Sequence, residues 1–329
     1  MRKRKYTSFA LGMVLSFLGL GLSPYPSTCD SFSILSHNDT YNAVFLPHHP
    51  IVIEKNSDFT YENGVIGGNG TREDPYIICS WEINGENGYG CIIINNTSAY
   101  LIIMHCKLHD AISGIFISNA SHINIKSNII SGSMYGTYIP ENATDIEIRQ
   151  NIYYNITKYG IKTGNSSILN LISGNIFIHC GEQQGAGIYI EREFGEGGQV
   201  IIERNFFGFN RGGVVLSATT SLIENNILLE NHCGIYAKIL TTGCNVTHNL
   251  FVNNNMSWAT ERAGFSSPVN NVLHHNIFFN TSADGVGTLP YGWTLWNTTD
   301  GGNYWWDWLT PDNNSDGFVD IPRRIDPTG

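Results

Sequence analysis

The stretch VIIERNFFGFNRGGVVLSATTSLIENNILLENHCGIYA, from Val200 to Ala237, decides the fold because it contains the same pattern twice. An apolar residue, two variable residues, an asparagine and two apolar residues are followed by glycine, an apolar residue, a variable residue and another apolar residue. The asparagine recurs along the chain at gaps of 23, 24, 30, 21, 23 and 27 residues. A repeat of about 20–30 residues built from short strands predicts a solenoid. The repeated asparagines are Asn128, Asn151, Asn175, Asn205, Asn226, Asn249 and Asn276.

The glycine part of the repeat predicts a short strand. In GIYI, which begins at Gly187, apolar and variable residues alternate with a period of two, and glycine allows a tight corner before the strand. No helical periodicity separates the repeats, so equivalent strands stack in parallel about 4.8 Å apart. The sequence therefore predicts an all-β, right-handed parallel β-helix of about eight coils.

The repeated asparagine is interpreted as a structural ladder and not as a catalytic column. Asparagine tolerates the left-handed backbone conformation that a sharp bend needs. Stacked amides can also bond to each other and to the backbone of the bend inside the coil. Cys106 occupies the equivalent place one coil earlier, and Cys91 also falls at a core position, so both are expected to be small buried residues.

The pattern divides the chain into consecutive segments. Residues 1–29 have a basic start and a 14-residue apolar run from Phe9 to Leu22, which predicts a signal peptide, with a retained N-terminal anchor as the alternative. Residues 30–49 are expected to form a linker, 50–80 an N-terminal cap, 81–292 the coils and 293–329 a tryptophan-rich C-terminal cap. An aromatic ligand platform is the alternative for the tryptophans, which are Trp293, Trp296, Trp305, Trp306 and Trp308.

Composition indicates a secreted or cell-surface protein. The formal charge is -10 without basic clusters beyond the first residues, which disfavours nucleic acid and anionic membranes as partners. Thirteen Asn-x-Ser/Thr sequons fit export and predict a glycoprotein. The seven cysteines include no CxxC pair, which disfavours a zinc or redox motif.

The chain resembles the right-handed β-helix proteins of the NosD type, which belong with the carbohydrate-binding and sugar-hydrolase (CASH) domains. The resemblance rests on the opening PIVIEKNSDFTYENGVIGGNGTREDPYIICSWEI (Pro50 to Ile83), the coils, and the closing GGNYWWDWLTPDNNSDGFVDIPRRID (Gly301 to Asp326). Similar proteins are common on archaeal cell surfaces. The founding member assists copper-site maturation of nitrous-oxide reductase, but the chain has no copper-ligand pattern to which that role could be transferred.

The C-terminal segment contains a candidate calcium loop. Alternate oxygen-bearing side chains surround Gly317, an arrangement that suits Ca²⁺ at an affinity of about 10⁻⁴–10⁻³ M. The role would be structural, no organic cofactor is expected, and a polar turn without metal is the alternative. The expected ligands are Asp312, Asn314, Asp316, the backbone carbonyl of Phe318, and Asp320.

Two residue columns are candidates for carbohydrate chemistry. An outward column two residues after each strand glycine could stack on sugar rings, although ordinary cross-strand packing is the alternative. Glu203 and Glu224 should lie on adjacent rungs about 5 Å apart, close to the carboxylate spacing of retaining glycosidases, with a solvated polar face as the alternative. The members of the outward column are Ile92, Phe116, Tyr138, Lys162, Tyr189, Val215 and Tyr236, of which Phe116, Tyr138, Tyr189 and Tyr236 are the candidate sugar-binding residues.

These patterns favour a non-catalytic surface protein that binds an extracellular glycan or a surface protein. The first alternative is a polysaccharide hydrolase or lyase that uses Glu203 and Glu224. The second alternative is a NosD-like periplasmic metal-delivery factor that binds copper through histidines. His248, His274 and His275 could ligate a metal because they lie beside Asn249 and Asn276, with ordinary turn histidines as the alternative.

Overall fold

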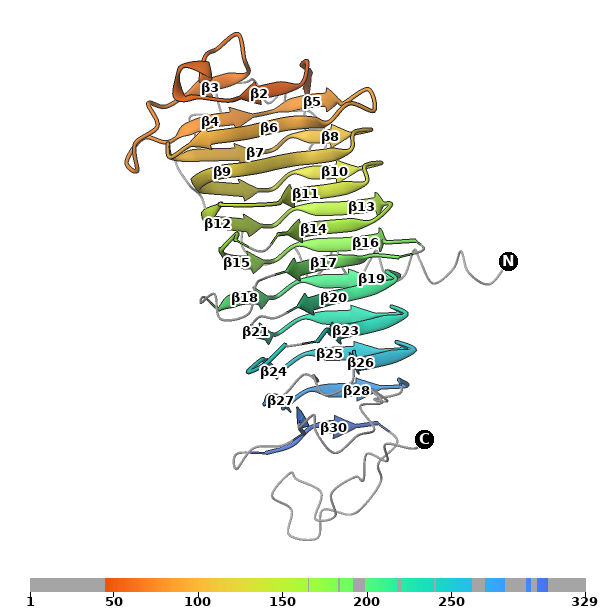
Figure 1. Ribbon diagram of the computed structural model, residues 1–329. Helices are drawn as coiled ribbons and strands as arrows, with labels where there is room; N and C mark the ends of the chain where they lie inside the picture. The colour runs from red at the N-terminus through yellow and green to blue at the C-terminus, as the bar shows by residue number, and fades with distance from the viewer. Residues whose placement is uncertain are drawn as a thin grey trace, which may run out of the picture. The chain divides into compact units, whose positions relative to one another are not determined.

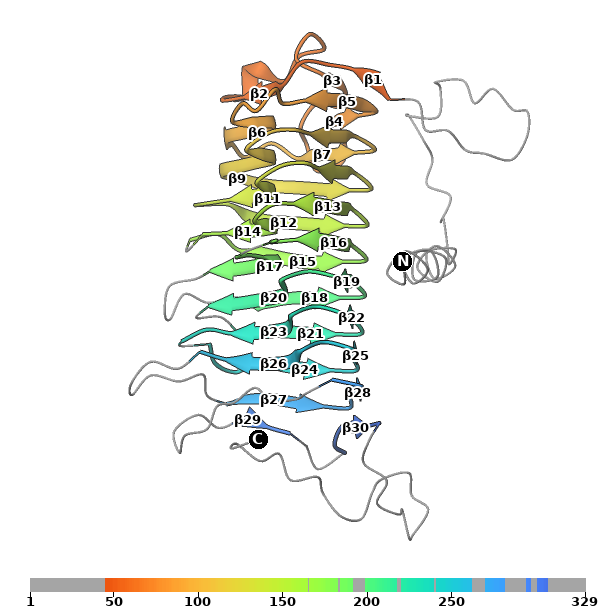
Figure 2. The same ribbon diagram turned by 90° about the vertical axis from the view of Figure 1, so that its right-hand side faces the viewer.

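The computed structural model shows a stack of coils built from short parallel strands (Figure 1). It describes residues 45–164, 166–182, 184–191, 199–217, 220–239, 241–261, 270–281, 294–296 and 301–306, which all belong to one compact unit. The strands form three columns, sheets A, B and C, which the view in Figure 2 separates. The expected all-β parallel solenoid is therefore confirmed.

Sheet A contains strands of two to five residues that follow the asparagine bends. Its eleven strands lie in chain order along the stack. They are β1 (Leu46–Pro47), β5 (Trp81–Asn84), β8 (Lys107–His109), β10 (Ile129–Ser131), β13 (Ile152–Ile156), β16 (Ile176–Cys180), β19 (Phe206–Gly208), β22 (Ile227–Leu229), β25 (Leu250–Val252), β28 (Ile277–Phe279) and β30 (Tyr304–Trp305).

Sheet B contains the strands with the glycine pattern. Its strands are β2 (Ile51–Ile53), β6 (Gly90–Thr97), the first half of β9 (Ser113–Lys126), β11 (Tyr135–Ile139), β14 (Tyr159–Thr163), β17 (Ala186–Glu191), β20 (Gly212–Ser217), β23 (Cys233–Ala237) and β26 (Met256–Thr260).

Sheet C precedes each asparagine bend. Its strands are β3 (Val65–Gly67), β4 (Tyr76–Cys79), β7 (Leu101–Met104), the second half of β9, β12 (Thr144–Arg149), β15 (Leu169–Ser173), β18 (Val200–Glu203), β21 (Ser221–Glu224), β24 (Asn245–Thr247), β27 (Asn271–His274) and β29 (Thr294–Leu295). The described residues form eight complete coils, from β5–β6–β7 to β25–β26–β27, as the repeat predicts. A short 3₁₀ helix, η1 (Asn56–Asp58), lies before the first of them.

The core lies inside the coils and is stacked along their axis. Side chains from the middle of the sheet A strands form continuous aromatic stacks, with centroid separations of 4.9 Å for Tyr153–Phe177 and 4.9 Å for Phe177–Phe207. Near the C-terminal end, Phe278 stacks on Trp305 at 4.3 Å. Each coil therefore buries its apolar side chains against the coil before and after it, which explains why one repeat alone has no core.

The seven repeated asparagines form a buried ladder at the bend from sheet C to sheet A. Asn226, for example, accepts hydrogen bonds from the backbone N–H (2.8 Å) and the side-chain amide (3.0 Å) of Asn205 on the previous rung. Its own amide donates to the carbonyl oxygen of Ile202 at 2.9 Å and to Oδ1 of Asn249 at 2.9 Å. The ladder continues to Asn303, which was not predicted. Asn303 Oδ1 accepts a hydrogen bond from the backbone N–H of Asn276 at 3.0 Å.

The predicted reason for asparagine at this bend is wrong in one respect. The left-handed backbone conformation belongs to the residue before each ladder asparagine, for example Arg204 (φ 53°), Asn225 (φ 56°) and His248 (φ 54°). The ladder asparagine itself is selected by its side chain, because it satisfies backbone groups that the bend buries.

A second ladder at the bend from sheet A to sheet B was missed by the sequence analysis. The members of this ladder lie five residues after ladder asparagines and are Asn210, Asn231 and Asn254. Asn231 Oδ1 accepts a hydrogen bond from the backbone N–H of Asn210 at 3.0 Å, and Asn254 Oδ1 accepts one from that of Asn231 at 2.9 Å. The available signal was an asparagine five residues after each of three consecutive ladder asparagines, Asn205, Asn226 and Asn249. Cys91 and Cys106 are fully buried at 0% exposed.

The ends of the stack are partly described. β1 and β2 pair in parallel with β5 and β6, and β3 pairs antiparallel with β4. Trp296 packs against both Phe278 and Trp305. The predicted cap boundaries stay predictions, because residues 1–44, 282–293 and 307–329 lie outside the described residues. Among the described residues, no helix has the length and apolar character that a membrane crossing requires.

Candidate functional site

The outer face of sheet B carries a row of aromatic side chains in register. Phe116 pairs with Tyr138, Tyr138 with Lys162, and Lys162 with Tyr189 on successive rungs. Tyr189 then pairs with Val215, and Val215 pairs with Tyr236. Six of the seven residues predicted for the outward column therefore lie together on this face.

The seventh residue, Ile92, is a correction. It pairs with Ile115, is 0% exposed and belongs to the core, whereas Ile93 pairs with Phe116. The reason is the register of the first complete coil, where Gly90 pairs with Ser113 and not with Gly114. In a strand a shift of one residue moves a side chain to the opposite face.

A second aromatic column beside the first was missed. Tyr135 pairs with Tyr159, one residue before the glycines of their strands, and Tyr135 stacks on Tyr138 with centroids 4.6 Å apart. Tyr159 stacks on Tyr189 at 5.0 Å, and the exposed Tyr89 contacts Phe116 at 4.9 Å. The tyrosine before GTYI and GIKT was the available signal. We call the side chains of Tyr89, Phe116, Tyr135, Tyr138, Tyr159, Tyr189 and Tyr236 the tyrosine face.

Lysines lie among the rings of the tyrosine face. Lys162 Nζ is 5.7 Å from the ring centroid of Tyr138 and 5.6 Å from that of Tyr189. Lys238 Nζ is 5.4 Å from the Tyr189 centroid and donates a hydrogen bond to Tyr189 Oη at 3.2 Å. Lys158 Nζ lies 5.8 Å from the Tyr135 centroid. The face therefore presents positive charge on a chain whose net charge is negative.

The charge state of the tyrosine face at neutral pH follows from its surroundings. Burial raises the pKa of Tyr138, Tyr159, Tyr189 and Tyr236, so these phenols stay neutral. Burial lowers the pKa of Lys238, but its hydrogen bond to Tyr189 and the nearby carboxylates of Glu261 and Glu191 together outweigh that effect, so the pKa is raised and the amine stays charged.

The candidate sugar-binding residues differ in exposure. Tyr138 and Tyr236 are partly exposed, whereas Phe116 and Tyr189 are buried at 7% and 6% exposed. Tyr89 contacts the ring of Phe116, and Tyr159 and Lys238 contact that of Tyr189. Phe116 and Tyr189 therefore support the face more than they offer a surface to a ligand. Tyr89, at 52% exposed, provides ring surface that the sequence analysis did not assign.

Glu203 and Glu224 lie on adjacent rungs of sheet C, where their Cα positions pair. Glu203 Oε1 accepts a hydrogen bond from Ser173 Oγ at 3.0 Å and lies 3.6 Å from Arg204 Nη1. Arg149 lies in the same column two rungs before Glu203, and its Nη2 is 3.0 Å from Glu147 Oε2. These carboxylates lie on a sheet face and do not line the hollow described next.

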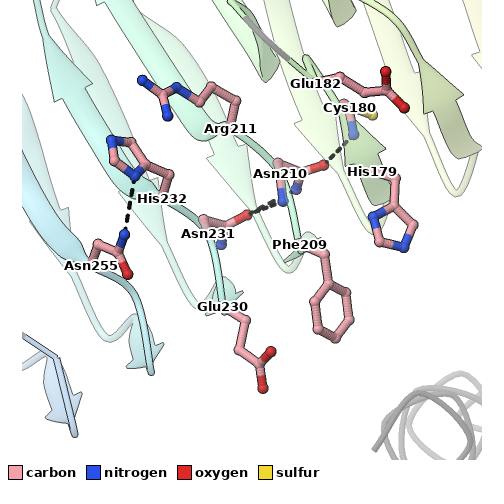
Figure 3. Close-up of a pocket in the computed structure, with 10 residues that line it drawn as sticks. All are labelled: His179, Cys180, Glu182, Phe209, Asn210, Arg211, Glu230, Asn231, His232 and Asn255. Carbon is pink, nitrogen blue, oxygen red and sulfur yellow. Dashed lines mark hydrogen bonds between the residues drawn. The ribbon is translucent and has the colours of Figure 1, made fainter. Parts of the chain in front are cut away.

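A hollow of about 360 Å³ lies at the bend from sheet A to sheet B (Figure 3). Figure 3 shows His179, Phe209 and Glu230 pointing to one side of the second ladder, with Arg211 and His232 on the other. Burial, followed by the charge of Arg211, lowers the pKa of His232, so this imidazole is neutral at pH 7. The remaining lining residues are Cys180, Glu182, Asn210, Asn231 and Asn255.

The predicted metal sites have different outcomes. The calcium loop (Asp312, Asn314, Asp316, Phe318 and Asp320) lies outside the described residues, as do Trp293 and Trp308. His248 and His275 stack at 5.2 Å, and His274 Nδ1 lies 2.7 Å from His275 Nδ1. Within the described ranges no group of three His, Cys, Asp or Glu side chains could hold a metal ion.

Comparison with known proteins identifies the class. The family described as "Right handed beta helix region" matches residues 90–246 and 141–303, which together cover more than half of the chain. The chain therefore belongs to the right-handed β-helix family, and the predicted handedness is confirmed at the level of that family. Its closer placement with NosD-type proteins stays a prediction.

Two solved structures are similar in fold. The alginate lyase from Paenibacillus sp. str. FPU-7 has 12% sequence identity and a TM-score of 0.43, with 79% of this chain and 96% of that chain covered. The A-module of the Azotobacter vinelandii mannuronan C-5 epimerase AlgE6 has 10% identity and a TM-score of 0.36, with 70% and 83% covered. The comparison with curated proteins finds no match. Similarities of this size do not assign an activity.

Proposed function

We propose that this protein is a secreted or cell-surface β-helix protein that binds an extended glycan along the tyrosine face without chemically changing it. The observation that carries the proposal is the row of rings that runs along successive rungs from Tyr89 to Tyr189 and resumes at Tyr236 after Val215, with lysines among the rings. A ligand that repeats along its length fits a surface that repeats along its length. Tyrosine offers such a ligand an apolar ring together with a polar hydroxyl.

The lysines favour a glycan with negative charges. Lys158, Lys162 and Lys238 place their amine groups among the rings, and an ammonium group attracts carboxylate or sulfate groups even on a protein that is acidic overall. Glu191 lies 3.8 Å from Lys162 and offsets part of this charge. We therefore expect binding to an acidic polysaccharide to weaken as salt is added.

The test is binding of polygalacturonate, with neutral dextran as the comparison, measured by isothermal titration calorimetry. Tyr138→Ala and Tyr236→Ala should each weaken binding roughly five- to tenfold, because each removes a contact worth about 1 kcal/mol. Tyr61→Ala is the matched control, because Tyr61 is 74% exposed and lies outside the tyrosine face. Equal affinity of wild type and both face variants for every glycan tried would refute the proposal.

A polysaccharide hydrolase or lyase is the second candidate, and the in-register pairing of Glu203 with Glu224 is the observation that favours it. Glu203→Gln and Glu224→Gln should abolish release of reducing ends or unsaturated products if these carboxylates are catalytic. A binding protein should show no turnover and should retain its glycan affinity in both variants. Stoichiometric copper binding through histidines would instead support the metal-delivery alternative.

A further inference from the structure

The outer face of sheet A is apolar along most of the stack. In these strands the middle residue points into the core, as Phe207, Leu228 and Phe251 do at 0% exposed, and the residues on either side of it point outward. Exposure is greatest toward the C-terminal end, where Ile277 is 44% and Phe279 is 49% exposed. The outward residues, which we call the apolar face, are Ile152, Tyr154, Ile176, Ile178, Phe206, Gly208, Ile227, Leu229, Leu250, Val252, Ile277, Phe279, Tyr304 and Trp306.

None of the residues of the apolar face is charged, and monomeric soluble proteins rarely expose contiguous apolar patches larger than a few hundred Å². Seven strands about 4.8 Å apart and about five residues wide, bends included, give a flat area of roughly 470 Å². The side chains standing on this area expose more surface than its projection, which brings it within reach of the roughly 800 Å² per partner of a stable complex. A patch of this size with a polar rim indicates an interaction site.

The rim of the apolar face carries an exposed charged residue of opposite sign on each side, Arg204, which lies 3.6 Å from Glu203, and Glu230. Arg204, with 71% of its side chain exposed, lies on the bend from sheet C. Glu230, also exposed, lies on the bend toward sheet B one rung further along. Suppose that a second copy packs against the apolar face with its coil axis parallel to that of the first copy, related by a two-fold axis along the same direction. The rim on the sheet C side of each copy then meets the rim on the sheet B side of the other. Arg204 of one copy then approaches Glu230 of the other copy, twice in the dimer.

The other kinds of occupant fit less well. The chain has a net charge of -10, so an anionic membrane would repel it. A glycan needs hydrogen-bond partners, which the outward side chains from β16 to β28 do not supply. A second copy supplies an uncharged surface of the same shape and the complementary rim.

We propose that two copies of this chain associate through the apolar face, with their coil axes parallel, to form a homodimer. The proposal is independent of glycan binding, because the tyrosine face belongs to a different sheet. In the dimer both tyrosine faces remain outside the contact, so one particle would hold two glycan-binding surfaces.

Sedimentation velocity of the full chain between 1 and 100 µM tests the proposal. Wild type should sediment as a dimer, and Ile227→Lys should raise the dissociation constant at least a hundredfold. Leu222→Lys is the matched control, because Leu222 is also partly exposed but lies on sheet C, and this variant should stay dimeric. Phe279→Ser, at a site 49% exposed, provides a second disrupting variant if Ile227→Lys misfolds by circular dichroism.

Charge exchange tests the arrangement. Arg204→Glu and Glu230→Arg should each weaken the dimer, and the double variant should restore it. A wild type that is monomeric at 100 µM would overturn the proposal, as would a loss of association in Leu222→Lys equal to that in Ile227→Lys. Monomeric protein that binds phosphatidylcholine vesicles through this face, and loses that binding in Phe279→Ser, would also overturn it in favour of a lipid surface.

Discussion

Removing one rung of the asparagine ladder should strongly destabilise the protein. In Asn226→Ala the backbone N–H and the amide of Asn205 each lose their acceptor, and the carbonyl of Ile202 loses its donor. All three groups are buried inside the coil. Leaving a buried polar group without a partner costs about 1–3 kcal/mol. Because water or neighbouring amides can satisfy some of these groups, we expect a total loss of about 3–6 kcal/mol in the free energy of unfolding.

Urea unfolding, followed by far-UV circular dichroism and tryptophan fluorescence, measures this loss. The control is Asn170→Ala, because Asn170 lies exposed on β15 and its amide donates a hydrogen bond to Asp145 Oδ1 at the surface, at 2.6 Å. That variant should change the free energy by no more than about 0.5 kcal/mol. If both variants unfold at the same urea concentration as wild type, the ladder does not stabilise the coil and the structural interpretation of the asparagine repeat is wrong.

Three further predictions concern the core and the C-terminal segment. Gly213→Ala should lower the free energy of unfolding by about 1–3 kcal/mol, because the new Cβ would lie 2.5 Å from the carbonyl oxygen of Gly234. Gly67 has open space around it, so Gly67→Ala should be nearly neutral in the same urea assay. Burial raises the pKa of Cys91 to about 12, above its unfolded value, so its contribution to stability is complete below about pH 8.5 and is lost as the pH rises toward 12. Between pH 8 and 11 the free energy of unfolding should therefore fall more steeply with pH in wild type than in Cys91→Ala, by up to about 1.4 kcal/mol per pH unit. Equal slopes in the two proteins would contradict this. Asp316→Ala should lower the melting temperature in Ca²⁺ and leave it unchanged in chelator; identical melting of both proteins with and without Ca²⁺ would exclude the calcium loop.

The features that repeat could be read from the sequence, because each coil solves the same packing problem. The spacing of the asparagines, the alternation after the glycines and the absence of helical periodicity were sufficient to predict the parallel solenoid and its eight coils. The ladder asparagines were identifiable for the same reason, since every bend buries the same backbone groups. Glu203 and Glu224 were placed on adjacent rungs from their position relative to Asn205 and Asn226 alone.

Features that depend on register and burial needed the tertiary structure. Ile92 and Phe116 follow the same sequence phrase, but a one-residue shift of the first complete coil places Ile92 in the core. The burial of Tyr189 depends on Lys238, which is 49 residues away in sequence. Repeat spacing does not encode a contact of this kind, because it joins side chains two rungs apart.

The apolar face shows most clearly where the sequence stops being informative. Both residues after each ladder asparagine are apolar, so hydrophobicity alone does not tell which one points into the coil. The left-handed residue that precedes the asparagine fixes the direction in which the chain leaves the bend. Since side chains alternate along a strand, this one backbone conformation sends the second apolar residue inward and the first to the surface. The sequence by itself thus determined the coil and its ladder, whereas the bend geometry decided which apolar residues the protein presents to its surroundings.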